Sequence, residues 1–214
     1  MEEYDPEPRW PALIAVAAVG GLYAALPPSV TVGPRWAFPA IVLALLIPTV
    51  LSHQARMHKV NAIFGILVTV ALTAGLILYL ALLVRALPDK KESPPALLLS
   101  ASMLWITNIL VFALWYWRLD AGGPNHRDRR AEHKDGAFLF PQMTMSDEAL
   151  AESNQQDWSP NFVDYLFLAF TTSTAFSPTD APVLARWAKL LMMLQSLLSL
   201  LIIALLAARA VNIL

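Results

Sequence analysis

The 214-residue chain contains no cysteine, which excludes a disulfide framework, a thiolate metal site and a cysteine nucleophile. Charged residues are also scarce, at 14% against about 25% in soluble domains. The net charge of −1 indicates no partner, and no basic patch for nucleic acid and no glycine-rich phosphate loop are present. What the chain has instead is a hydrophobic content of 57%, which indicates a membrane protein.

Five apolar segments are long enough to be considered as membrane-spanning helices. We place them at Trp10–Leu26, Trp36–Ser52, Val60–Val84, Pro95–Trp117 and Leu184–Asn212. The acidic start of the chain lacks the basic region of a cleaved signal peptide, so we expect the first segment to be retained. The sequence therefore predicts an all-α integral membrane protein.

A sixth apolar segment, 161–180, is too short to cross a membrane. It is apolar from Phe162 to Phe170, continues with hydroxyl and alanine residues, and breaks at Pro178. A bilayer core about 30 Å thick requires about 20 apolar residues in a helix. We predict a re-entrant helix, started by Ser159-Pro160, whose irregular end is buried in protein or in a water-filled cavity. The predicted fold is thus five transmembrane helices plus one re-entrant pore-type helix before the last helix.

The C-terminal part resembles the pore module of the tetrameric potassium-channel superfamily. The resemblance rests on Tyr165, Phe167 and Phe170 followed by Thr171 and Thr172 in a short helix before a long apolar one. It divides the chain into an N-terminal three-helix region, 1–94, and a pore-like module, 95–214. The module would comprise an outer helix at 95–117, a hydrophilic loop at 118–159, a re-entrant helix and filter-like turn at 160–180, and an inner helix at 184–212. The resemblance implies a homotetramer, with ions and the lipid bilayer as partners.

The whole chain also resembles a group of uncharacterised bacterial integral membrane proteins. The residues that carry this resemblance are Asp120-Ala-Gly-Gly-Pro and Ala175-Phe-Ser-Pro-Thr-Asp. It implies a location in the bacterial inner (plasma) membrane and brings no activity with it.

The filter-like turn departs from the potassium-channel pattern because it has no glycine. A stack of carbonyl rings needs backbone conformations that glycine adopts without steric cost, and Phe176 and Pro178 stand where glycines would fall. Hydroxyls could coordinate a partly hydrated cation instead, and Phe176 could form a hydrophobic constriction.

The predicted site residues are Thr171, Thr172, Ser173, Thr174, Ala175, Phe176, Ser177, Pro178, Thr179 and Asp180. We predict channel-like passage of monovalent cations through this turn. The alternatives are a non-conducting scaffold with a plugged pore-like fold and a small-solute transporter.

The last helix carries polar residues on one face, and each has two interpretations. Gln195, Ser199 and Arg209 recur at helical spacing and are predicted to line the inner pore. Alternatively, Gln195 bonds across a helix interface and Arg209 extends to the headgroups. Asn108, in the middle of the fourth helix, is expected to hold helices together, with a lining role second.

No catalytic set converges in the sequence, so we expect no enzyme activity and no cofactor. His53 and His58 are five residues apart, which places them on different helix faces and argues against a metal site. The hydrophilic loop contains an apolar patch, Phe138–Pro141, that could dock on the membrane domain. Basic residues on the two sides of the membrane nearly balance, so the sequence leaves the orientation open.

Overall fold

The computed structural model describes residues 7–27, 31–86, 93–128, 136–156, 158–175 and 181–211. Within these ranges the regular elements are all helices, joined by a single isolated β-bridge. Four helices are long and apolar enough to cross a membrane: α2 (Ala37–Gln54), α3 (His58–Ala86), α4 (Pro94–Leu119) and α8 (Arg186–Val211). The first predicted span, α1 (Trp10–Ala25), is apolar but shorter, with 16 residues.

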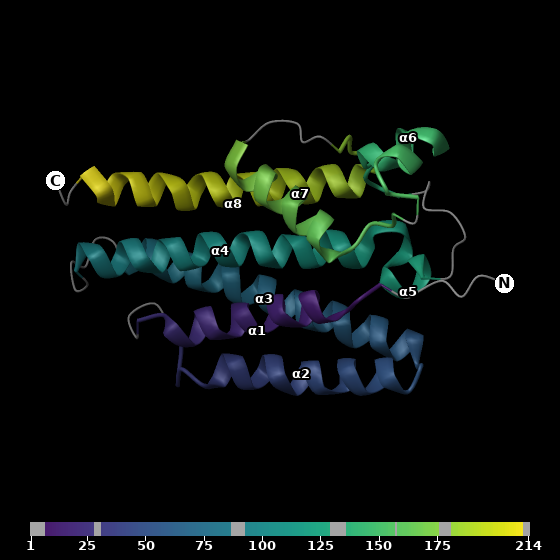
Figure 1. The fold of residues 1–214 in the computed structure, drawn as a ribbon. Coiled ribbons are helices and arrows are strands. Elements are labelled where there is room, and N and C mark those ends of the chain that lie inside the picture. Colours follow the sequence, from purple (N-terminus) through teal and green to yellow (C-terminus); the bar gives the residue numbers. More distant parts are fainter. Residues whose placement is uncertain are drawn as a thin grey trace.

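The long helices lie side by side, and the short elements gather at one end of the bundle (Figure 1). We call this the loop end; α1, α3, α7 and α8 begin there, and α2 and α4 end there. The short elements at the loop end are η2 (Asp120–Gly122), α5 (Pro124–Arg127), η3 (Pro141–Thr144) and α6 (Asp147–Glu152), whereas α7 (Phe162–Ala175) extends from there across the middle of the bundle.

Local sequence explains where the helices begin and how closely they pack. The Ser93 hydroxyl caps α4 by accepting a hydrogen bond from the backbone N–H of Ala96, and proline follows in the first turn. On α3, a Cβ added to Gly75 would lie 2.5 Å from the ring of Phe38 on α2. The absence of a side chain at Gly75 therefore allows a close contact between α2 and α3.

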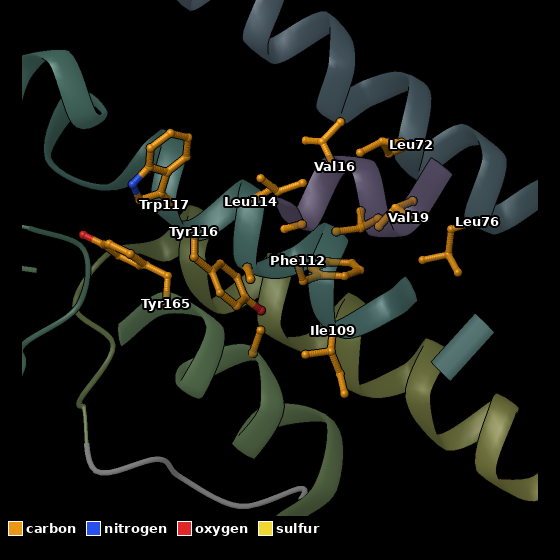
Figure 2. Packing of buried hydrophobic residues seen from close by; sticks show 14 of the residues in the cluster. Val16, Val19, Leu72, Leu76, Ile109, Phe112, Leu114, Tyr116, Trp117 and Tyr165 are labelled. Atoms are coloured by element: carbon orange, nitrogen blue, oxygen red, sulfur yellow. The ribbon is translucent and has the colours of Figure 1, made fainter. Parts of the chain in front are cut away.

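Helix α4 is the centre of the fold. It packs against α1, α3, α7 and α8, and Phe112 and Tyr116 on it are fully buried (Figure 2). Helix α8, in contrast, is mostly exposed and buries only the face that meets α4 and α7. In a membrane, lipid can cover such an exposed apolar face, so the exposure does not by itself require a partner.

The apolar patch of the hydrophilic loop docks on the bundle, as the sequence predicted. Phe138 is fully buried, with its ring centroid 5.2 Å from that of Tyr116 and 6.2 Å from that of Trp187. Phe138 also forms the isolated antiparallel bridge with Val183. The ring of Phe140 stacks against Trp158 at 5.7 Å. The loop therefore contacts the chain both just before α7 and just after it.

Candidate functional site

Helix α7 enters the bundle through a capped first turn. The Asn161 side chain accepts a hydrogen bond from the backbone N–H of Val163, at 2.8 Å. The Asp164 carboxylate accepts one from the backbone N–H of Asn161, also at 2.8 Å. Asn161 therefore caps the helix and Asp164 bonds back to it, so the helix begins at Phe162 rather than at the predicted Ser159-Pro160. Burial raises the pKa of Asp164 from its ordinary value, although the backbone hydrogen bond from Asn161 opposes this.

Helix α7 is short, and the segments before and after it contact the same part of the loop. Its 14 residues extend about 21 Å at 1.5 Å per residue, which is less than a bilayer core of about 30 Å. The preceding Trp158 contacts the docked patch, and the following Pro182 accepts a hydrogen bond from Leu139 at 2.9 Å. Both flanks of α7 thus lie at the loop end, while the helix itself leans across α4 and α8 (Figure 1).

The predicted hydroxyl residues at the end of α7 divide between two sides of the helix. Thr172 and Ser173 are buried, whereas Thr174 and the terminal Ala175 are exposed and Thr171 is half-buried. The threonine hydroxyls donate to backbone carbonyls one turn earlier, as in Thr174 to Phe170 at 2.9 Å. A threonine oxygen that donates in this way keeps lone pairs with which it can accept a hydrogen bond or coordinate a cation. The remaining predicted turn residues, Phe176, Ser177, Pro178, Thr179 and Asp180, lie outside the described residues.

Gln195 of α8 lies at the centre of a buried polar cluster between α4, α7 and α8. Its amide nitrogen donates to the carbonyl of Ala169 and to the Ser173 hydroxyl, both at 2.7 Å. Its amide oxygen accepts from the hydroxyl of Tyr116 on α4. Gln195, Ser173 and Tyr116 are each fully buried. These contacts are the ones expected under the alternative interpretation, in which Gln195 bonds across a helix interface.

Ser199 and Asn108 extend the same cluster by further bonds between helices. The Ser199 hydroxyl donates to the Ser173 carbonyl at 2.8 Å and accepts from the indole of Trp105 at 3.2 Å. The Asn108 amide donates to the Ser173 hydroxyl and to the Gln195 carbonyl, each at 3.4 Å. A lining role for Gln195 or Ser199 would require these side chains to leave their partners. The side chain of Arg209, the third predicted lining residue, lies outside the described part of the chain.

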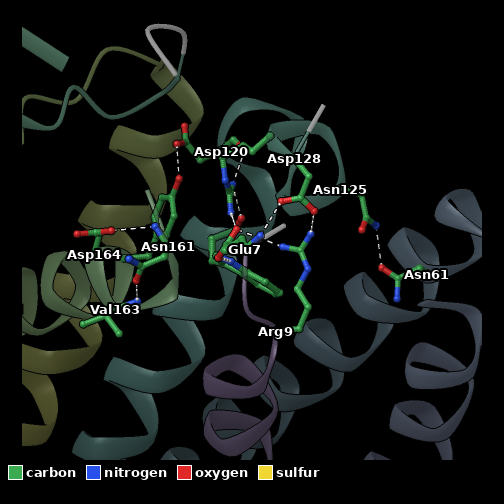
Figure 3. A network of polar contacts seen from close by, with 12 residues as sticks. Glu7, Arg9, Asn61, Asp120, Asn125, Asp128, Asn161, Val163 and Asp164 are labelled. Atoms are coloured by element: carbon green, nitrogen blue, oxygen red, sulfur yellow. Dashed lines mark hydrogen bonds and ion pairs between the residues drawn. The ribbon is translucent and has the colours of Figure 1, made fainter. Parts of the chain in front are cut away.

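A network of charges at the loop end, which the sequence did not predict, ties the N-terminal segment to the α4–α5 region (Figure 3). The Glu7 carboxylate accepts from Arg127 at 3.0 Å, from Arg9 at 3.1 Å and from the Trp117 indole. The Arg9 guanidinium also pairs with Asp128. Glu7 and Arg127 are almost completely buried, so each charge depends on the other for compensation. Burial lowers the pKa of Arg9, and the carboxylates of Asp128 and Glu7 partly offset this.

Asp120 connects the loop to α7. Its carboxylate accepts from the backbone N–H of Ala137 and, at 2.6 Å, from the hydroxyl of Tyr165. The following Gly122 and Gly123 have φ of +84° and +88°, a region that favours glycine. The Asp120-Ala-Gly-Gly-Pro motif therefore makes a tight turn that holds its aspartate over the first turn of α7.

No family model, curated protein sequence or solved structure matches this chain. Among the described residues, no group of three or more acidic or histidine side chains is placed to hold a metal ion.

Proposed function

We propose that the chain assembles into a channel-like membrane protein in which the end of α7 and the turn at 176–180 form the narrow part of an ion pathway. The observation that carries the proposal is the course of α7. This helix is shorter than a bilayer core, has both flanks at the loop end, and packs against the two long helices α4 and α8. Non-helical backbone within the hydrocarbon region of a bilayer is tolerated where it is buried in protein or lines a water-filled cavity.

The end of α7 favours cations over anions. The C-terminal end of a helix carries a partial negative charge, and the exposed Thr174 places a hydroxyl oxygen in the last turn. The sequence has no lysine or arginine between Lys134 and Arg186, so no basic residue in this stretch opposes a cation. We therefore propose monovalent cations as the permeant species, with weak selectivity because the turn has no glycine.

One such helix cannot enclose a pathway, so the proposal requires several copies around an axis. Four is the number that the resemblance to potassium-channel pores implies. In such a ring, the exposed face of α7, which includes Val163, Phe167 and Thr174, would be available to neighbouring copies or to the axis.

The buried polar cluster around Gln195 favours a second candidate, a non-conducting membrane scaffold. The three helices hydrogen-bond to one another there within one chain, which stabilises α7 without any need for an aqueous path. The same contacts are compatible with a channel in which α8 supports α7 from behind. Flux measurements separate the two candidates.

The test is cation flux into liposomes that contain the purified protein. Thr174→Val removes an exposed hydroxyl from the proposed pathway and keeps the side-chain volume, so we expect altered flux or selectivity. Thr144→Val is the matched control, because the hydroxyl of Thr144 is also exposed and also donates to a nearby backbone carbonyl, but it lies in η3. If Phe176 constricts the axis, Phe176→Ala raises the flux. Anion flux without cation flux, or no flux from assembled protein, contradicts the proposal.

A further inference from the structure

A pocket with a basic lining opens at the loop end, and no residue of α7 lines it. It has a volume of about 430 Å³ and lies between the start of α3, the end of α4 and the turn through η2 and α5. Its charged or titratable lining residues are His58, Lys59, Arg118 and His126. No aspartate or glutamate is among the described residues that line it. Lys59 and both histidines are exposed, so the pocket is accessible from the aqueous side.

Arg118 is the unusual member of this lining, because its guanidinium has no acidic partner in the described part of the chain. Its Nε atom is buried without a hydrogen-bond partner there. Its guanidinium carbon lies 5.4 Å from the centroid of the Trp117 ring, and a Cβ added to Gly65 would lie 1.6 Å from one of its terminal nitrogens. Arg118 is therefore held in place by an aromatic ring and by the bare backbone of α3.

The other two arginines nearby each have a carboxylate partner, although the Nε atom of Arg127 is also buried without a hydrogen bond among the described residues. Arg9 pairs with Glu7 and Asp128, and Arg127 pairs with Glu7. A buried charge without an opposite charge or a hydrogen-bond acceptor is costly. Among the described residues, the fold thus places a guanidinium without an acidic partner at the wall of a pocket whose lining includes no acid, and an anion in that pocket would supply the missing partner.

We propose that this pocket binds a phosphate-bearing anion. The planar guanidinium of Arg118 can bind two phosphate oxygens at once, and Lys59 adds a point charge at the exposed side. His58 and His126 add ring N–H donors. The phosphate can belong to a soluble molecule or to a lipid headgroup, since the pocket lies at an end of the membrane-spanning helices. The site involves neither α7 nor residues 176–180, so it is independent of ion conduction.

The test measures phosphate binding by the purified full-length protein in a zwitterionic detergent, using isothermal titration calorimetry with inorganic phosphate. Lys59→Gln and Arg118→Gln should each weaken binding about tenfold or more, because each removes a charge-assisted contact. Lys189→Gln is the matched control: Lys189 is an exposed basic residue at the loop end that does not line the pocket. Because Lys59 is exposed, its variant is expected to fold even if the Arg118 variant does not.

A second arm uses native mass spectrometry after incubation with an anionic phospholipid or with phosphatidylcholine alone. If the protein binds inorganic phosphate, and Lys59→Gln and Arg118→Gln (the pocket variants) weaken that binding, the ligand is a soluble molecule. If the protein instead retains the anionic lipid and does not bind inorganic phosphate, and the same variants weaken lipid retention, the ligand is a lipid headgroup. The proposal is overturned if neither ligand binds, if the pocket variants bind like the wild type, or if Lys189→Gln weakens binding equally.

Discussion

Replacing Gln195 by leucine distinguishes most directly between a residue that supports α7 and one that lines a pathway. The substitution keeps the side-chain size but removes one acceptor and two donor contacts, with Tyr116, Ala169 and Ser173 as partners. The Tyr116 hydroxyl is left as a buried donor without its acceptor, which costs about 1–3 kcal/mol. The other two contacts contribute about 0.6 kcal/mol each, as is typical between membrane helices. We therefore expect the free energy of unfolding to fall by about 2–4 kcal/mol.

The assay is reversible unfolding in mixed micelles, followed by tryptophan fluorescence, together with a double-mutant cycle. Tyr116→Phe alone should destabilise the protein by about 1–2 kcal/mol, since it leaves the Gln195 oxygen unsatisfied. The double variant should lose less stability than the sum of the losses of the two single variants, because both ends of the hydrogen bond are then apolar. Met193→Leu, on the exposed face of the same helix, should leave stability unchanged. Wild-type stability of Gln195→Leu, combined with altered cation flux, would refute the interface role and favour lining.

Three further predictions concern the loop end and the start of α7. Most of the described basic residues, among them Arg56 and Lys59, lie at the loop end, so we expect this end in the cytoplasm. In the cysteine-free chain, an impermeant maleimide applied to intact cells should then label Val32→Cys and not Met57→Cys; the reverse pattern inverts the orientation. Tyr165→Phe removes a hydrogen bond to the buried Asp120 carboxylate and should lower the free energy of unfolding by about 1.5–3 kcal/mol. An unchanged free energy of unfolding would mean that this contact does not hold the loop. Asn161→Ala removes a helix cap and should lower the free energy of unfolding by about 1 kcal/mol. Asn161→Asp keeps an acceptor and should lower it by less. Equal losses in the two variants would contradict a capping role for Asn161.

The long helices were predictable because an apolar run and its boundary residues are local signals. The helix expected at Trp36–Ser52 is Ala37–Gln54, and that expected at Pro95–Trp117 is Pro94–Leu119. The start of α7 was placed too early, at Ser159-Pro160, because proline and serine favour a helix start in general. The cap that selects Phe162 depends on the side chain of Asn161 accepting from Val163 and on that of Asp164 turning back to Asn161, an arrangement that the sequence permits but does not require.

The candidate site was less predictable because its contacts join residues far apart in the chain. Helical spacing placed Gln195 and Ser199 on one face, but spacing does not determine whether that face meets α4 and α7 or an axis between subunits. The pair of Glu7 and Arg127 joins residues 120 positions apart, and no local pattern relates them. Arg118 likewise lies against Gly65, a residue 53 positions earlier in the chain to which no local pattern relates it.

The measurement that tests the central claim most directly is a cryo-EM reconstruction of the purified protein in lipid nanodiscs. It would give the number of subunits and the position of residues 171–180. The proposal predicts a closed ring with the end of α7 and the following turn at the axis, and a pathway along that axis wide enough for a partly hydrated cation. A monomer, or a ring in which this turn faces away from the axis, would contradict the channel proposal and favour the scaffold.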